Sequence, residues 1–287
     1  MIKRLLIFGF GYCAESLLLK LKNSDWKINI VTRDLNKVNK LRNRGFIACQ
    51  WSDKIEIKAY IEKADAVLVC VPPVGFIDPV QDEFSEFFSK LHKKSKFIYL
   101  SSTGVYGDHM GNWVDEKSDV NPTTKLGLWR LNAEKLWLNL SENLGLSLTI
   151  MRLSGIYGPN RSPFDKLKKG SVNVIKKQGL LFSRIHVDDI TEIIRICLNR
   201  NNISGIYNIC DNKPASSQQV MEEACRLLGI DCPKPIPIEK LNLSKIALGF
   251  YSESKKVCNK KILEELKYEM IHPNYFSGLR SIIKKAG

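Results

Sequence analysis

Short apolar runs alternate with longer segments of mixed polarity through the first half of the chain. The runs are rich in Ile, Val, Leu and Phe, a composition typical of buried strands. We predict strands at residues 5–8, 28–31, 46–49, 66–71, 97–101 and 148–152. Helices are expected between them, at residues 12–21, 35–44, 55–63, 80–93 and 123–144. Strand alternating with helix implies parallel pairing, so the pattern predicts an α/β fold with a doubly wound parallel sheet.

The alternation loosens after Arg152, where glycines and prolines precede a basic patch at residues 166–170. Later helices are predicted at residues 188–199, 216–228, 240–249 and 259–266, with a strand at 206–210. We therefore expect a main domain over residues 1–154. Residues 155–287 form a mixed segment that returns to the main domain at about 186–212 and otherwise builds a small C-terminal substrate-binding lobe.

A glycine-rich turn follows the first predicted strand directly and opens the first predicted helix. It has the form G-x-G-x-x-A, made by Gly9, Phe10, Gly11, Tyr12, Cys13 and Ala14. Such a turn presents backbone N–H groups to a diphosphate and lets helix and strand pack closely. The motif predicts that residues 1–154 form a Rossmann-type domain that binds NAD or NADP; the alternative is a purely structural turn.

The residues that end the second strand bear on which cofactor is bound. Thr32 is followed by Arg33, about where an acidic residue would hold the ribose of NAD. A guanidinium suits a 2′-phosphate, so NADP is preferred over NAD. The alternative is a solvated Arg33 beside an Asp34 that caps the next helix. Val71, Pro72 and Pro73 close the fourth strand and are expected to wall the adenosine side of the cofactor.

Composition narrows the classes of partner and the compartment. Lys and Arg total 44 against 30 acidic residues, a net charge of +14, but the lysines are scattered over amphipathic helices. This favours a solvated surface over a nucleic-acid interface. The eight cysteines form no C-x-x-C and no His/Cys cluster of zinc-ligand spacing, so no metal is predicted and a reducing cytoplasm is expected. The apolar N-terminus is too short for a signal peptide or a membrane span, and no membrane association is expected.

The fifth predicted strand ends in three hydroxyl side chains and a turn, F-I-Y-L-S-S-T-G-V-Y-G over residues 97–107. This resembles the short-chain dehydrogenase/reductase superfamily, in particular its extended branch of epimerases and dehydratases. The resemblance implies that Ser102 hydrogen-bonds the reacting oxygen of a substrate, with Ser101 on the cofactor side and Thr103 on the substrate side. A local Ser/Thr turn is the alternative.

The tyrosine and lysine of that superfamily's Tyr-x-x-x-Lys pair are both replaced here. The matching segment, residues 122–134, reads P-T-T-K-L-G-L-W-R-L-N-A-E, with Leu126 in the tyrosine position and Arg130 in the lysine position. Leucine cannot carry a proton, whereas Arg130 can still hold the cofactor's ribose. The chain is thus similar to an atypical subgroup without the tyrosine. The candidates for a replacement are Tyr106, Lys125, Tyr157 and His186.

Two later motifs also match the family. Residues 151–161, M-R-L-S-G-I-Y-G-P-N-R, resemble its R-x-x-N-V-Y-G-P segment, with Gly155 in place of asparagine. Gly155, Arg161 and Arg184 are predicted to face the substrate, and the arginines would suit an anionic one; the alternative is surface arginine. Residues 181–190 match I-H-V-x-D-[IL], where Asp188 or Asp189 is expected to cap a helix and His186 to pack inside or contact substrate.

These observations predict an NAD(P)-dependent oxidoreductase or epimerase/dehydratase-like protein. Its substrate would be a small polar, anionic carbonyl or hydroxyl compound. A cofactor-binding sensor or interaction protein that has lost catalysis is the competing interpretation, and nucleic-acid binding rests on charge alone. The family resemblance implies a homodimer.

Overall fold

A seven-stranded sheet forms the centre of the first half of the chain. The computed structural model describes residues 2–91, 95–170, 174–242 and 244–286. The strand order is β11-β7-β5-β4-β1-β2-β3, and β1 pairs in parallel with both β2 and β4. The strands are β1 Lys3–Phe8, β2 Trp26–Thr32, β3 Ile47–Gln50, β4 Ala66–Val69, β5 Lys96–Ser102, β7 Ser147–Leu153 and β11 Gly205–Ile209. The predicted doubly wound α/β sheet is confirmed.

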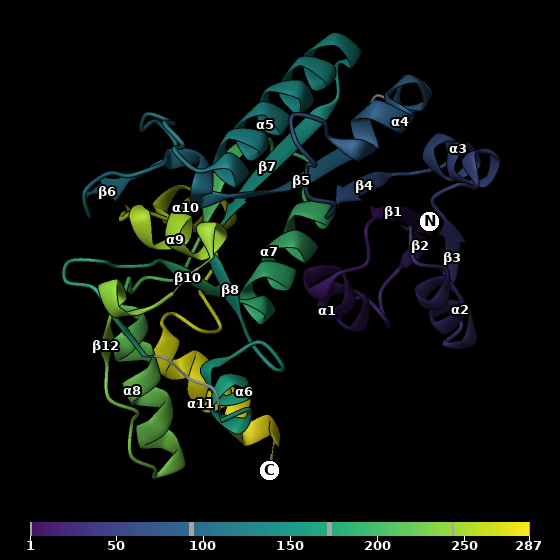
Figure 1. The fold of residues 1–287 in the computed structure, drawn as a ribbon. Helices are drawn as coiled ribbons and strands as arrows, with labels where there is room; N and C mark the ends of the chain where they lie inside the picture. The colour runs from purple at the N-terminus through teal and green to yellow at the C-terminus, as the bar shows by residue number, and fades with distance from the viewer. Residues whose placement is uncertain (1, 92–94, 171–173, 243, 287) are drawn as a thin grey trace. The chain divides into compact units, whose positions relative to one another are not determined.

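Helices lie on both faces of this sheet. They are α1 Tyr12–Lys20, α2 Leu35–Asn43, α3 Lys54–Glu62, α4 Pro79–Phe88, α5 Lys125–Leu144 and α7 Val187–Asn199. Figure 1 shows α1, α2 and α7 on one side of the strands and α3, α4 and α5 on the other. The helix predicted at 80–93 ends earlier, since α4 stops at Phe88, and residues 92–94 lie outside the described part of the chain.

The chain divides into two compact units, each gathered from three stretches. The first comprises residues 1–102, 128–152 and 191–207, and the second comprises 103–127, 153–190 and 208–287. The sequence suggested a single boundary near residue 154 with a return at 186–212. In the structure, the 103–127 segment that follows β5 also belongs to the second unit.

Aspartates start three of the helices in the first unit. Asp34 accepts hydrogen bonds from the backbone N–H groups of Asn36 and Lys37, and Asp53 and Asp78 cap α3 and α4 in the same way. A carboxylate at this position satisfies first-turn N–H groups and favours the positive end of the helix dipole. These caps fix where each helix leaves the end of its preceding strand.

A connected set of aromatic rings fills the core between the sheet and helices α3 to α5. Phe8 of β1 packs on Phe84 of α4 with ring centroids 5.3 Å apart. Phe97 of β5 lies 4.7 Å from the ring of Trp137 of α5, whose Nε1–H donates to the Asp78 carboxylate at 3.0 Å. Such rings combine large buried area with favourable edge contacts. They pack the end of β1 and the start of β5 against helices α4 and α5 in one connected core.

The second unit is built from short elements around its own apolar cluster. Its strands and helices are β6 Trp113–Val114, β8 Gly155–Tyr157, α6 Pro163–Lys168, β9 Ile175–Lys176, β10 Arg184–His186, α8 Ser217–Leu228, β12 Ile236–Pro237, α9 Lys245–Ser252, β13 Lys256–Val257, α10 Lys260–Leu266 and α11 Tyr275–Ala286, with 3-10 turns at Thr103–Tyr106 and Ile238–Lys240. Helices α6, α8 and α11 contribute Phe164, Val220 and Leu279 to the cluster. The helix predicted at 240–249 begins later, at Lys245, and residue 243 lies outside the described residues.

Candidate functional site

The glycine turn after β1 has the geometry that a diphosphate requires. Gly9 has φ +88°, and a Cβ there would lie 2.8 Å from Cγ2 of Val71. Gly11 is the N-cap of α1 and has no side chain to cover the first turn, while Ala14 is fully buried against the sheet. The N–H groups of a helix's first turn lack intrahelical acceptors and bind anions well. These residues therefore fit the diphosphate of a dinucleotide.

The predicted cofactor residues of the first unit gather at one edge of the sheet. Residues 9–14 follow β1, Thr32 and Arg33 end β2, residues 71–73 follow β4, and Ser101 and Ser102 end β5. These four strands are consecutive in the sheet. The carboxyl ends of parallel strands share an edge, and open α/β sheets bind ligands there.

Arg33 is exposed, and its guanidinium lies over an aromatic ring. Its guanidinium carbon lies 4.7 Å from the ring centroid of Trp51, and the Trp51 Nε1–H donates to Glu83 at 2.7 Å. Asp34 caps α2, as the alternative interpretation proposed. Lys37, one turn into α2, donates from Nζ to the carbonyl of Phe10 at 3.2 Å. Two cations thus follow the end of β2, and Lys37 contacts the glycine turn.

A buried ionic network lies beneath the end of β5. The Ser101 hydroxyl donates to the Glu134 carboxylate, which also pairs with the Arg152 guanidinium at 2.8 Å. Ser102 is half-buried, and alternation along a strand turns its side chain to the opposite face from Ser101. The structure therefore gives the two adjacent hydroxyls different surroundings.

Arg130 brings a positive charge to the same strand end. Its NH1 donates to the Tyr99 hydroxyl at 2.8 Å and to the Leu100 carbonyl at 2.9 Å. Burial raises the pKa of Tyr99, so this hydroxyl stays protonated near neutral pH. The arginine that replaces the family lysine is thus fixed against β5, where it can offer its remaining donors to a ribose.

The residues that could replace the family tyrosine as proton carrier differ in burial and hydrogen bonding within the second unit. Leu126 is 55% exposed. Tyr106 is fully buried and donates to Asn208 Oδ1 at 2.8 Å, while burial raises the pKa of Tyr157. Lys125 is exposed. Neither tyrosine is arranged to exchange protons with solvent near neutral pH.

The predicted substrate residues also lie in the second unit. Thr103 donates to the Leu153 carbonyl at 3.5 Å, and Gly155 and Arg161 are exposed. Arg184 directs its NH1 to the carbonyls of Phe182 and Ala215, at 2.9 and 2.7 Å, so part of its guanidinium supports the local backbone. Their contact with a substrate stays a prediction.

Asp211 is a buried titratable group that the sequence analysis did not select as a site residue. Burial raises the pKa of this carboxyl to about 7, although the Lys213 N–H and Arg184 both act to lower it. Its Oδ1 accepts from the Lys213 N–H at 3.1 Å, and its Oδ2 has no hydrogen-bond partner among the described residues. Perturbed carboxyls of this kind concentrate at functional sites. The aspartate lies two residues beyond the end of β11, and this position was the one signal in the sequence.

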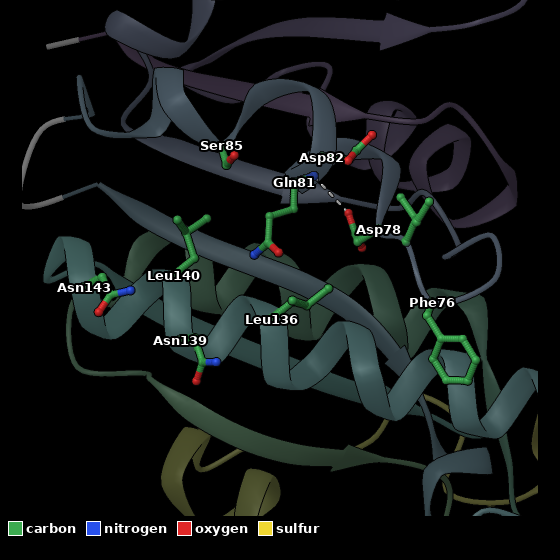
Figure 2. A pocket seen from close by; sticks show the side chains of 10 residues that line it. Phe76, Asp78, Gln81, Asp82, Ser85, Leu136, Asn139, Leu140 and Asn143 are labelled. Carbon is green, nitrogen blue, oxygen red and sulfur yellow. Dashed lines mark hydrogen bonds between the residues drawn. The ribbon is translucent and has the colours of Figure 1, made fainter.

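A shallow groove of about 460 Å³ lies elsewhere in the first unit, between α4 and α5. Figure 2 shows Gln81 of α4 extending toward Leu136 of α5, and Asp82, Ser85 and Leu140 also line the groove. None of the predicted site residues lines this groove. It is therefore separate from the strand ends that carry the cofactor motifs.

A parallel sheet with a glycine turn after its first strand and a cation after its second defines a dinucleotide-binding α/β protein. The family comparison makes this more specific. The chain belongs to the NAD dependent epimerase/dehydratase family, whose model matches residues 5–210. The resemblance to the extended short-chain dehydrogenases/reductases is thereby confirmed.

Several individual proteins are similar to this chain. Protein YeeZ of Escherichia coli (strain K12) is 25% identical over 95% of this chain and 97% of its own length. A conserved protein of unknown function from Silicibacter pomeroyi has 35% identity and a TM-score of 0.89, with 99% of each chain covered. The human epimerase family protein SDR39U1, solved with NADPH, has 16% identity and a TM-score of 0.74, covering 98% of this chain and 99% of that one.

The Bacillus cereus UDP-glucuronic acid 4-epimerase, solved with NAD, is alike in fold. Its TM-score is 0.75 at 18% identity, covering 98% of this chain and 99% of that one. Neighbours of the same fold were therefore solved with NAD in one case and NADPH in another. Among the described residues, no helix is both long and apolar enough to cross a membrane.

Proposed function

We propose that the chain is an NADP-dependent oxidoreductase or epimerase that acts on a small polar, anionic carbonyl or hydroxyl compound. The observation that carries this proposal is the gathering of the glycine turn, Arg33 and Arg130 at the carboxyl ends of neighbouring strands. Bound NADP would supply the hydride chemistry. Cytoplasmic location and a homodimeric state remain predictions from the sequence.

Each role follows from the chemistry of the side chain and its place. Residues 9–14 bind the diphosphate, Arg33 pairs with the 2′-phosphate, and Arg130 bonds ribose hydroxyls. Ser102 donates to the reacting oxygen of the substrate, as its match to the family motif implies. Leu126 cannot carry a proton, so proton transfer is left to another group.

The substrate class is narrowed by one replacement. Gly155 removes the amide that the family motif carries, so this chain lacks one polar group for a hexose. Relatives include an Arabidopsis thaliana enzyme named as a UDP-glucose 4,6-dehydratase, 26% identical over 47% of this chain. We infer a substrate that shares the anionic character of such compounds but is smaller than a nucleotide sugar.

The cofactor assignment predicts that NADP binds about 10- to 100-fold more tightly than NAD, the strength of a charge-assisted contact. Replacing Arg33 with Asp should reverse this order, because a carboxylate repels the 2′-phosphate and accepts from the ribose hydroxyls. Calorimetric titration of the wild type and the variant with each cofactor measures these affinities. Arg44→Asp changes the same charge at the far end of α2 and should keep the wild-type order. Equal affinities in the wild type would remove Arg33 from cofactor selection.

Loss of the Ser102 hydroxyl should slow turnover roughly 100-fold, the usual effect of removing one donor to a reacting oxygen. The assay follows NADPH absorbance with UDP-glucose, UDP-glucuronic acid, dTDP-glucose and small hydroxy acids as probes. Ser89→Ala, at the exposed end of α4, is the matched control and should be as active as the wild type. Full activity in Ser102→Ala would exclude Ser102 from the reaction.

The exposed Leu126 in the tyrosine position favours a second candidate, an NADP-binding sensor. This alternative keeps the cofactor site and predicts tight NADP binding without turnover of any probe. It also predicts a protein partner whose binding depends on NADP and is lost in Arg33→Asp. The two assays above separate the candidates, because only the enzyme converts a substrate.

A further inference from the structure

Two histidines and a carboxylate meet at the junction of β10 and α7 in the second unit. Nδ1 of His186 lies 3.7 Å from Oδ2 of Asp188, and Nε2 of His272 lies 3.3 Å from the same oxygen. The two imidazole centroids are 4.0 Å apart. One ligand atom from each residue falls within 4.8 Å of both others.

We propose that His186, Asp188 and His272 form a Zn²⁺ site. Two imidazole nitrogens and one carboxylate oxygen are the donor set of open zinc sites, which keep a fourth position for water. Ligands about 2.0–2.2 Å from a tetrahedral ion are separated from one another by roughly 3.3–3.5 Å. The distances of 3.3 and 3.7 Å to Asp188 are close to this spacing, and the two histidine nitrogens lie within 4.8 Å of each other, so the imidazoles move together when the ion binds.

The hydrogen bonding of His186 leaves its Nδ1 unprotonated, as metal binding requires. The backbone N–H of Asp188 donates to its Nδ1 at 3.1 Å, so this nitrogen carries the lone pair that a metal needs. Metal binding replaces that hydrogen bond. The N–H released belongs to the first turn of α7, where N–H groups have no intrahelical acceptor.

The chain holds His272 in place through the neighbouring carboxylate. Both oxygens of Asp189 accept from the segment before α11: Oδ1 from the Tyr268 hydroxyl at 2.6 Å and from the Ile271 N–H at 2.8 Å, and Oδ2 from the His272 N–H at 3.1 Å. The sequence suggested a helix cap here, whereas the structure makes Asp189 an anchor. Outer groups of this kind fix the direction of metal ligands.

Of the three proposed ligands, only Asp188 has a side chain that is substantially exposed to solvent. His186 is fully buried and His272 is 6% exposed, while the side chain of Asp188 is 26% exposed. An ion can thus enter on the Asp188 side, where a water can complete its coordination. Spacing along the sequence could not suggest this cluster, because His272 comes from a distant part of the chain that only the fold brings to His186.

The test uses the full-length protein, stripped with EDTA and desalted. Calorimetry with Zn²⁺ should show one site per chain, and Co²⁺ should give the visible absorption of a four-coordinate ion. His272→Gln and Asp188→Asn should each weaken Zn²⁺ binding by about 100-fold or more, since even the loss of an outer partner costs 10- to 100-fold. His109→Gln, in the same unit but outside the cluster, should bind as the wild type does.

Thermal unfolding provides a second readout that does not depend on activity. Zn²⁺ should raise the Tm of the wild type and of His109→Gln, because a ligand that binds only the folded state stabilises it. It should leave the Tm of His272→Gln unchanged, with circular dichroism confirming that this variant folds. Wild-type binding no tighter than that of His272→Gln, or equal loss in His109→Gln, would overturn the assignment.

Discussion

Replacing Arg152 with methionine should lower the free energy of unfolding by about 3–5 kcal/mol, because it leaves the Glu134 carboxylate buried without a counter-charge. The two side chains are 4% and 2% exposed and make three hydrogen bonds between 2.8 and 3.3 Å. Ser101 also donates to Glu134, but a neutral hydroxyl cannot offset the lost charge. Urea unfolding followed by circular dichroism measures the change.

Two comparison variants make this result specific. Adding Glu134→Leu to Arg152→Met should restore much of the stability, since an apolar pair of similar volume does not carry the cost of burying charge. Arg195→Met breaks a half-buried pair on α7 but leaves Glu192 paired with Lys20, so it should cost about 1 kcal/mol or less. If the double variant were as unstable as the single one, the loss would be one of packing rather than of charge.

Asp211 should make the protein less stable as the pH rises from about 4 to about 7. Burial raises the native pKa of this carboxyl from 3.8 to about 7, so in that range the native state binds more protons than the unfolded state. Stability falls with pH wherever the unfolded state binds fewer protons, and the effect levels off above the native pKa. Between pH 5 and pH 8 the cost is about 3 kcal/mol.

Asp211→Asn removes the titration while keeping an oxygen for the Lys213 N–H. From pH 5 to pH 8, the free energy of unfolding of the wild type should therefore fall by about 3 kcal/mol relative to that of this variant. Urea unfolding at a series of pH values measures the difference. Asp119→Asn alters an exposed carboxyl of the same unit and should keep the wild-type profile. A constant difference between Asp211→Asn and the wild type would contradict the raised pKa.

The sheet could be predicted from sequence because its strands are short apolar runs and its helices have strong start signals. Asp34 and Asp53 follow strands and cap the next helices, so local chemistry and global fold agree. The glycine turn was predictable for the same reason, since its geometry depends on the absence of side chains at Gly9 and Gly11 themselves. Local patterns suffice where the structure is set by neighbours in the chain.

The second unit was harder because distant residues determine it. Helix α11 was not predicted, although Tyr275, Leu279 and Ile282 form an apolar stripe along it. A Cβ at Gly278 would overlap the Tyr157 hydroxyl, so this glycine allows close packing on a side chain that is remote in the sequence. The pairing of β8 with β10 also joins segments that are not neighbours in the chain.

The candidate site divides in the same way. Arg33 could be found because it follows a strand at a position with known chemistry. His272 and Asp211 could not, since a histidine becomes a ligand candidate, and an aspartate a near-neutral acid, only through what the fold packs around them. Sequence thus predicts the part of a site that belongs to one strand end and misses what tertiary burial creates.

Each compact unit is assembled from three separate stretches, which constrains how the chain can fold during synthesis on the ribosome. The first unit lacks its last stretch until residue 207 has emerged, and the second waits for the residues up to 287. Segment 103–127 is made early, but its strand β6 pairs with β13 at residues 256–257, so it waits for this partner while well over a hundred later residues are synthesised, at roughly 5–20 residues per second. Val105, Tyr106 and Val114 of that segment are buried in the folded unit, so nascent chains of intermediate length present these apolar side chains to chaperones.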